Sequence, residues 1–227
     1  TLEECPFIDI VVRREGEETF KELVNNLESY TENASSLKKI KGITFRNNGR
    51  IEETENRPFI KNLNEIPFPA YHLLPMDRYR LEGKRFAAIM SSRGCPFSCI
   101  FCSSSALFGK VWRARSPENV IEEIKLLKNK YRVREIEFLD DTFTLNNKRA
   151  GKICDLLIKE NLGISWSCSS RVDTINQSLI EKLKKAGCHT IYLGIESGSQ
   201  KILNIISKGI TLTQAEKAVN LVKKVKL

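Results

Sequence analysis

Residues 95–102 read Cys-Pro-Phe-Ser-Cys-Ile-Phe-Cys, shortly after the apolar run Phe-Ala-Ala-Ile-Met at residues 86–90. The run predicts a strand, so Cys95, Cys99 and Cys102 are expected in the loop that follows it. Thiolates favour iron–sulfur clusters and zinc, and three of them so close together can surround one metal centre. A structural zinc would need a fourth ligand nearby, and no further cysteine or histidine occurs before Cys154. The spacing therefore predicts a metal centre with one coordination position left for a substrate or cofactor.

Strand and helix patterns alternate from residue 84 to the C-terminus. Short apolar runs, each followed by a helical period, lie at residues 86–90, 135–139, 164–168 and 190–195. Such alternation with short connections requires parallel strands, which places this region in the α/β class. Ser116 before Pro117, and Thr213 three residues before Glu216, predict two of the helix starts. Four strands cannot close a barrel, so we expect a partial barrel or an open sheet.

The part before residue 84 divides into two segments. Residues 1–56 contain a β-branched run at residues 8–13 and two short strands around the turn Asn-Asn-Gly at residues 47–49, which predicts the end of an α/β domain. Residues 57–83 contain several prolines and no long period, so they are interpreted as a linker. Residues 84–227 form the predicted core domain. The chain begins with Thr1 and ends inside a helical pattern, so we expect it to be part of a longer protein.

The predicted strands end in polar residues. The second is followed by Asp140 and Asp141, the third by Ser169 and Arg171, and the fourth by Glu196. Because α/β barrels build their sites at the carboxyl ends of their strands, these side chains are expected to share one site with the cysteine loop. Carboxylates can bind an ammonium group or ribose hydroxyls, and an arginine can hold a carboxylate through two hydrogen bonds.

Composition limits the compartment and the partners. The chain has 227 residues, and its 37 Lys+Arg against 28 Asp+Glu give a formal net charge of +9. Residues 201–227 contribute 6 − 1 = +5, but their lysines, Lys208 among them, alternate with apolar residues as on the solvated face of a helix. We therefore expect no nucleic-acid partner. No apolar run approaches the roughly 20 residues that span a bilayer, and no signal peptide opens the chain, so a cytoplasmic location is expected.

The remaining cysteines do not indicate a disulfide framework. Seven cysteines, an odd number, are distributed as three in one loop and four scattered along the chain. Cys154 lies on the apolar face of a predicted helix and Cys188 follows a glycine that ends one, so both are interpreted as small buried hydrophobic residues. Cys168, at a strand end, is a weaker candidate for the site.

The cysteine loop, placed after a first strand, resembles the radical S-adenosylmethionine (SAM) superfamily over residues 84–227. The resemblance implies a [4Fe-4S] cluster held by Cys95, Cys99 and Cys102, and it implies that SAM binds the remaining iron. It assigns the following contacts with SAM: Phe101 near the adenine, Asp140 and Asp141 at the amino group, Ser169 and Arg171 at the third strand end, and Glu196 at the ribose. It further implies an enzyme that cleaves SAM reductively to a 5′-deoxyadenosyl radical, with a one-electron donor of the flavodoxin or ferredoxin type and a small-molecule substrate.

Residues 8–20, 42–46 and 66–70 resemble the last part of a Rossmann-like cobalamin-binding domain joined to a radical SAM partner. This arrangement is found in the cobalamin-dependent radical SAM methyltransferases and in relatives of the anaerobic porphyrin-ester cyclases. It implies methylation or a related rearrangement or cyclisation. The Asp-x-His-x-x-Gly motif that supplies the cobalt ligand in many such domains does not occur in these residues, so cobalamin is expected only in the full-length parent.

Two other functions remain open from the sequence. A radical SAM methylthiotransferase that acts on RNA or protein would fit the positive charge, but three more cluster cysteines are expected in its N-terminal domain, where only Cys5 is present. A non-catalytic iron–sulfur protein would need a fully ligated cluster, and it would not need the charged strand ends.

Overall fold

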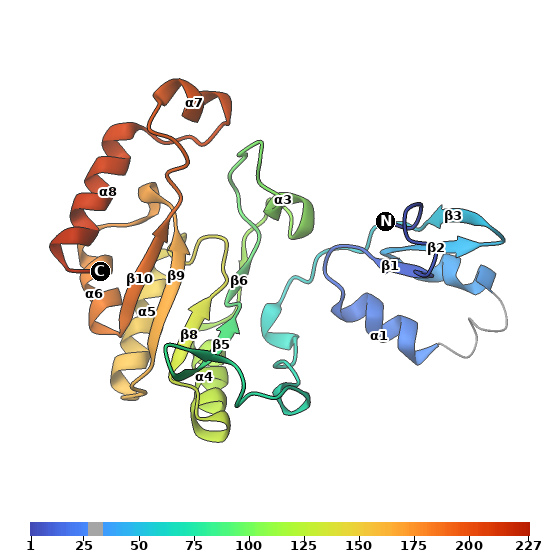
Figure 1. Ribbon diagram of the computed structural model, residues 1–227, viewed down its shortest axis with the longest axis horizontal. Coiled ribbons are helices and arrows are strands. Elements are labelled where there is room, and N and C mark those ends of the chain that lie inside the picture. Colours follow the sequence, from blue (N-terminus) through green and yellow to red (C-terminus); the bar gives the residue numbers. More distant parts are fainter. Residues whose placement is uncertain (27–33) are drawn as a thin grey trace. The chain divides into compact units, whose positions relative to one another are not determined.

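A computed structural model describes residues 1–26 and 34–227, and the chain forms two compact units (Figure 1). The first unit consists of Thr1–Lys61 together with Ser103–Gly109, and the second of Asn62–Cys102 together with Lys110–Leu227. The division after Lys61 falls inside the segment 57–83 that the sequence predicts to be a linker.

The first unit is built on a three-stranded antiparallel sheet with the order β1-β2-β3. Its strands and helices are β1 (Ile10–Val12), α1 (Glu17–Asn25), the 3-10 helix η1 (Ala34–Lys39), β2 (Ile43–Asn47), β3 (Arg50–Glu53) and α3 (Ser104–Leu107). The expected turn between β2 and β3 is confirmed, since Asn48 and Gly49 both have positive φ, at 48° and 80°. A two-residue turn of this kind matches the twist of the strands that it joins.

The second unit contains a five-stranded sheet with the order β10-β9-β8-β5-β4. The strands are β4 (Arg80–Leu81), β5 (Lys84–Ile89), β8 (Glu135–Phe138), β9 (Ser165–Ser170) and β10 (Cys188–Leu193). β5, β8, β9 and β10 pair in parallel, as the alternating pattern predicts, and β4 pairs antiparallel with β5 at the edge. Part of the predicted linker therefore belongs to this sheet. β6 (Ser92–Arg93) and β7 (Arg113–Ala114) form a separate two-stranded ribbon.

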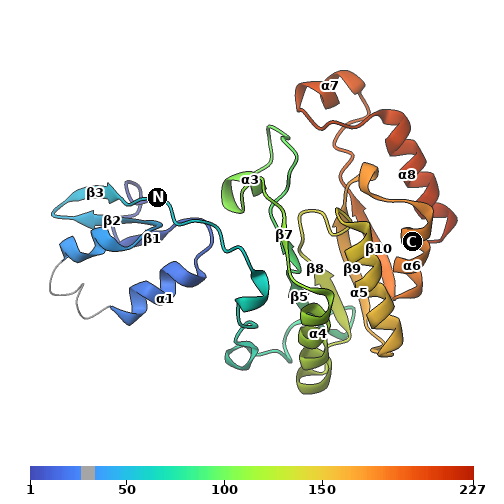
Figure 2. The ribbon, with the colours of Figure 1, turned by 180° about the vertical axis from the view of Figure 1, so that it is seen from behind.

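Helices cover one face of the parallel sheet, behind it in Figure 1 and in front of it in Figure 2. They are α4 (Pro117–Tyr131), α5 (Asn147–Lys159), α6 (Gln177–Lys185) and α8 (Leu212–Lys224), and a shorter helix, α7 (Gln200–Ile205), precedes α8. The 3-10 helices η2 (Leu63–Glu65), η3 (Tyr71–Leu73) and η4 (Val172–Thr174) complete the unit. The result is the partial α/β barrel that the sequence predicts, open on the face without helices. In the part of the chain that is described, every helix is too short or too polar to cross a bilayer.

Aromatic side chains fill the core between the sheet and its helices. Trp166 on β9 lies 5.3 Å from Phe138 on β8 and 5.5 Å from Phe143, between ring centroids, and all three side chains are buried. The Trp166 indole N–H donates to the carbonyl oxygen of Ala186 at 2.9 Å, so its polar group is satisfied inside the core. This packing fixes β8 and β9 in register below the polar ends of the strands.

Of the two predicted helix starts, one is confirmed and one is wrong. Ser116 caps α4 by accepting a hydrogen bond from the Asn119 N–H at 3.1 Å, which confirms that helix start. The predicted capping box of Thr213 and Glu216 is wrong, because α8 begins two residues earlier. Its capping box is formed by Thr211, whose backbone is extended, and Gln214.

Candidate active site

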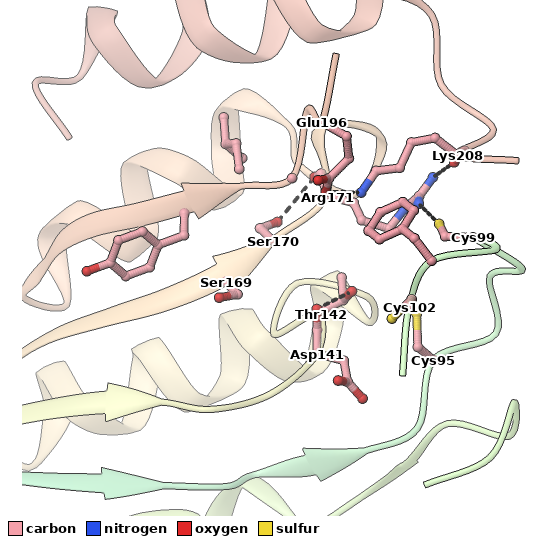
Figure 3. A pocket seen from close by; sticks show the side chains of 14 residues that line it. Cys95, Cys99, Cys102, Asp141, Thr142, Ser169, Ser170, Arg171, Glu196 and Lys208 are labelled. Carbon is pink, nitrogen blue, oxygen red and sulfur yellow. Dashed lines mark hydrogen bonds and ion pairs between the residues drawn. The ribbon is translucent and has the colours of Figure 1, made fainter. Parts of the chain in front are cut away.

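A pocket of about 310 Å³ lies at the carboxyl ends of the parallel strands, beside the cysteine loop (Figure 3). Its lining contains all three loop cysteines, and Figure 3 shows them opposite the ends of β9 and β10. The other lining residues are Phe101, Asp141, Thr142, Ser169, Ser170, Arg171, Tyr192, Leu193, Gly194, Glu196 and Lys208. The structure thus brings together eight of the nine site residues that the sequence predicts, all except Asp140.

The cysteine loop is tied into the fold through its backbone. The Cys102 N–H donates to the Cys99 carbonyl at 3.2 Å, and the Ile100 N–H donates to the Ile206 carbonyl, beyond α7, at 3.1 Å. Cys95 and Cys99 are half-buried and Cys102 is exposed, and burial raises the pKa of the Cys95 thiol. No three His, Cys, Asp or Glu side chains are pre-assembled around one metal position within residues 1–26 and 34–227. Three soft donors on one short loop nevertheless fit an iron–sulfur cluster better than a hard cation.

The two neighbouring aspartates after β8 point to different places. Asp141 lines the pocket, whereas Asp140 is buried. The Asp140 carboxylate accepts hydrogen bonds from the Ser91 N–H and hydroxyl, both at 2.6 Å, and from the Ser92 hydroxyl at 2.5 Å. Burial raises the pKa of the Asp140 carboxyl, and these hydrogen bonds oppose the rise. Asp140 therefore braces the chain after β5, in contrast to the expectation that both carboxylates face SAM.

Arg171 is buried at the end of β9, and its guanidinium group is held from several sides. Nε and Nη2 donate to the two carboxylate oxygens of Asp173 at 2.9 and 2.8 Å, and Nη2 also donates to the Lys208 carbonyl at 2.9 Å. Nη1 lies 3.9 Å from the Cys99 sulfur. These four hydrogen bonds leave one guanidinium N–H uncommitted.

Lys208 is the functional candidate that sequence reasoning missed. The alternating pattern of residues 201–227 groups it with solvated lysines. In the structure it lies in the turn between α7 and α8, is buried, and places its ammonium 2.8 Å from Glu196 Oε1. Glu196 has a φ of +70°, a left-handed conformation that is uncommon for a residue with a side chain and is often found at functional sites. A Cβ on Gly194 would lie 2.9 Å from both charged groups, so the ends of these two side chains would have to shift if any other residue stood there. A turn with positive φ at Ser207 and Gly209 surrounds Lys208, and the glycine is the only signal of it in the sequence.

Three further cysteines of the second unit lie in its core and are not part of the pocket lining. Cys154, Cys168 and Cys188 are all buried in the core, as expected for Cys154 and Cys188, and Cys168 is not among the pocket residues. Burial raises the pKa of the Cys154 thiol to about 12. A hydrogen bond with Cys188, together with burial, raises the pKa of Cys168 well above its usual value. Thiols with such pKa values are unreactive.

The fold and the pocket together define an α/β protein that carries a three-thiol loop at the carboxyl ends of its parallel strands. The model of the radical SAM superfamily matches residues 89–227, and the chain belongs to this superfamily.

Three known proteins extend the comparison. An uncharacterized methyltransferase from Pyrococcus horikoshii is 53% identical over 224 residues, which are 99% of this chain and 48% of that protein. The anaerobic magnesium-protoporphyrin IX monomethyl ester cyclase from Cereibacter sphaeroides is 32% identical over 230 residues, which are 98% of this chain and 37% of the cyclase. The chain thus spans about half, or less, of the length of these relatives. The cobalamin-dependent SAM radical enzyme OxsB, solved with aqua-cobalamin and SAM bound, shares the fold. The two structures superpose with a TM-score of 0.81 and are 23% identical in sequence. The match covers 97% of this chain and 32% of the OxsB chain.

Proposed function

We propose that this chain provides the cluster-binding and SAM-binding part of a radical SAM enzyme. One observation carries the proposal: Cys95, Cys99 and Cys102 line the same pocket as Glu196 and Lys208. Soft thiolates suit an iron–sulfur cluster, and the charged strand ends suit the polar groups of SAM. A protein that only stores or relays electrons would have no need for such a polar pocket beside its cluster.

Each pocket residue has a proposed role. The three loop cysteines hold the cluster, and the coordination position that they leave free receives SAM. Phe101, which is exposed beside the cysteines, is suited to pack against the adenine. Asp141 and Ser169 are placed to bind the methionine moiety of SAM, and the carboxylate of Glu196, held by Lys208, is suited to the ribose hydroxyls.

The chemistry comes from the groups that these residues hold. A reduced iron–sulfur cluster held by Cys95, Cys99 and Cys102 would supply the single electron needed to cleave SAM into methionine and a 5′-deoxyadenosyl radical, the species that would take hydrogen from a substrate. The protein's part is to orient SAM in the pocket and to keep the cluster in place. Arg171 contributes one uncommitted N–H toward the SAM carboxylate, which is weaker than the two-bond clamp that the sequence suggested.

For the full-length protein we propose methylation or cyclisation of a small molecule with the help of cobalamin. A methyltransferase and a cyclase among the relatives support this range, and the fold shared with OxsB supports the cobalamin subclass. The electron donor is proposed to be of the flavodoxin or ferredoxin type. Since the loop needs reduced thiols, we also propose a cytoplasmic location.

Anaerobic reconstitution with iron and sulfide tests the proposed function. The protein should bind a cluster whose electron paramagnetic resonance (EPR) spectrum, after reduction with dithionite, changes when SAM is added. Cys99→Ala should lose this signal, whereas Cys5→Ala, which alters an exposed cysteine of the first unit, should keep it. An unchanged spectrum on SAM addition to the parent, or an equal signal from Cys99→Ala, would refute the proposal.

A further inference from the structure

Arg171 makes two contacts with the cysteine loop itself. The central carbon of its guanidinium group lies 3.5 Å from the centroid of the Phe97 ring, and Nη1 points at the Cys99 sulfur at 3.9 Å. Phe97 and Cys99 both belong to the eight-residue stretch 95–102. Arg171 is buried and Phe97 is half-buried, and a planar cation stacked on a ring away from water makes one of the stronger contacts available to an arginine side chain.

The opposite edge of the guanidinium group is anchored outside the loop. Asp173 takes two hydrogen bonds from it, and the Lys208 carbonyl takes a third. The segment that contains Lys208 also contacts the loop directly, because the Ile206 carbonyl accepts from the Ile100 N–H. Arg171 therefore connects the end of β9, the turn before α8 and the cysteine loop.

We propose that Arg171 is a positioning residue that holds the cysteine loop in its ligating shape, before and after the cluster binds. It acts through the Phe97 ring and the Cys99 sulfur, and it needs the flat, forked guanidinium group for both contacts. The part of this role that concerns the bound cluster rests on the proposed function, while the part that concerns loop order does not. An arginine that clamps the SAM carboxylate would need two N–H groups without partners in the protein, whereas four of the five N–H groups of Arg171 already have one.

The contact between Arg171 and the Cys99 sulfur should also affect the reduction potential of a bound cluster. An N–H group directed at a cluster sulfur stabilises the negative charge that the cluster gains on reduction, and hydrogen bonds to sulfur are among the factors that set cluster potentials. Loss of the Arg171 contact is therefore expected to lower the midpoint potential of the cluster, even in the absence of SAM.

Amide hydrogen exchange of the cluster-free protein tests loop order without any cofactor. The variants are Arg171→Lys, which keeps the positive charge, and Phe97→Leu, which leaves every polar partner of Arg171 in place. Both should accelerate exchange in the peptide that contains Ile100 by roughly tenfold, as loss of a desolvated cation–π contact implies. Lys110→Ala is the matched control, because the exposed Lys110 side chain reaches the same loop through a long, 3.4 Å contact to the Ser98 hydroxyl. Unchanged exchange in both test variants would overturn the proposal.

Measurements on the reconstituted protein separate the two proposals. Arg171→Lys should release iron to a chelator roughly 10- to 100-fold faster, the factor by which loss of a partner of a metal ligand typically lowers metal affinity. Its SAM-free midpoint potential, followed by EPR, should lie below that of the parent. A normal potential and iron release, with only weaker SAM binding, would make Arg171 a SAM clamp and overturn the positioning role. Faster exchange in a protein that binds no cluster would refute the proposed function but leave the role in loop order standing.

Discussion

Removing the charge of Glu196 and removing the charge of Lys208 should change the stability of the second unit by different amounts, although both changes break the same ion pair. The Lys208 side chain is 7% exposed, whereas that of Glu196 is 33% exposed. Water can therefore compensate a Glu196 carboxylate that has lost its partner, but it has little access to a Lys208 ammonium in the same situation. Glu196→Gln should consequently destabilise the second unit more than Lys208→Met does.

The expected magnitudes follow from burial. Breaking a fully buried pair costs about 3–5 kcal/mol, and the partial exposure of Glu196 lowers this to about 1–3 kcal/mol for Glu196→Gln. Lys208→Met removes the desolvated charge, keeps the apolar stem and leaves the Lys208 carbonyl available to Arg171, so its cost should stay below about 1 kcal/mol. The double variant should resemble Lys208→Met, which implies a coupling energy equal in size to the cost of Glu196→Gln, about 1–3 kcal/mol.

Urea unfolding followed by tryptophan fluorescence measures these effects. Both tryptophans, Trp112 and Trp166, belong to the second unit, so the signal reports on that unit alone. If Glu196→Gln proves no more destabilising than Lys208→Met, the ammonium is not the desolvated member of the pair, and the reasoning is refuted. Titration calorimetry of SAM on the reconstituted protein adds a functional readout, in which both single variants should bind SAM more weakly.

Three further predictions concern the same unit. Burial raises the pKa of the Asp140 carboxyl, so the folded chain holds the carboxyl proton to a higher pH than the unfolded chain does. The free energy of unfolding should therefore fall as the pH rises from the usual aspartate range through the raised pKa, and it should level off above that pKa. Urea midpoints across that pH range should show this slope in the parent and lack it in Asp140→Asn. Gly187→Ala should cost about 3 kcal/mol or more, since φ is +97° and the new Cβ would lie 2.4 Å from the Ile164 carbonyl oxygen. Thermal unfolding should show a much smaller loss, about 1 kcal/mol, for Gly209→Ala, which has a φ of +70° but open space around it. Asp141→Asn should weaken SAM binding with little change in stability, whereas Asp140→Asn should change stability with little effect on SAM binding. Calorimetry measures the first effect and urea unfolding the second.

The local patterns of the sequence were sufficient for the parallel sheet. Each run of apolar residues that was expected to form a strand overlaps an observed one, because alternation of short strands with amphipathic helices admits few arrangements. The cysteine loop was equally predictable, since its spacing is local. The turn at residues 47–49 followed from backbone preferences alone.

Features that depend on distant contacts were not predictable from these patterns. Lys208 looks like any exposed lysine until the turn before α8 brings it to Glu196, twelve residues earlier in the chain. α3 follows the cysteine loop in sequence but groups with the first unit, where a Cβ on Gly109 would lie 2.6 Å from the Phe59 ring. Neither contact leaves a periodic signal, because each joins segments that are far apart in the sequence.

The division between structural and pocket residues at the strand ends follows from strand geometry. Successive side chains of a strand point to opposite faces, so Asp140 continues the helix-covered side of Phe138, and Asp141 continues the open side. Phe138 pairs with Cys168 in register, which places that cysteine in the same buried layer and leaves Ser169 to the pocket. Over residues 138–141 and 168–169, counting in twos from Phe138 thus separates a buried carboxylate and a buried thiol from their neighbours in the pocket; the alternation ends there, since Thr142 and Ser170 also line the pocket. A slip of one residue in this ladder would exchange the two sets, so the aromatic core that fixes the register also determines which polar groups reach the cysteine loop.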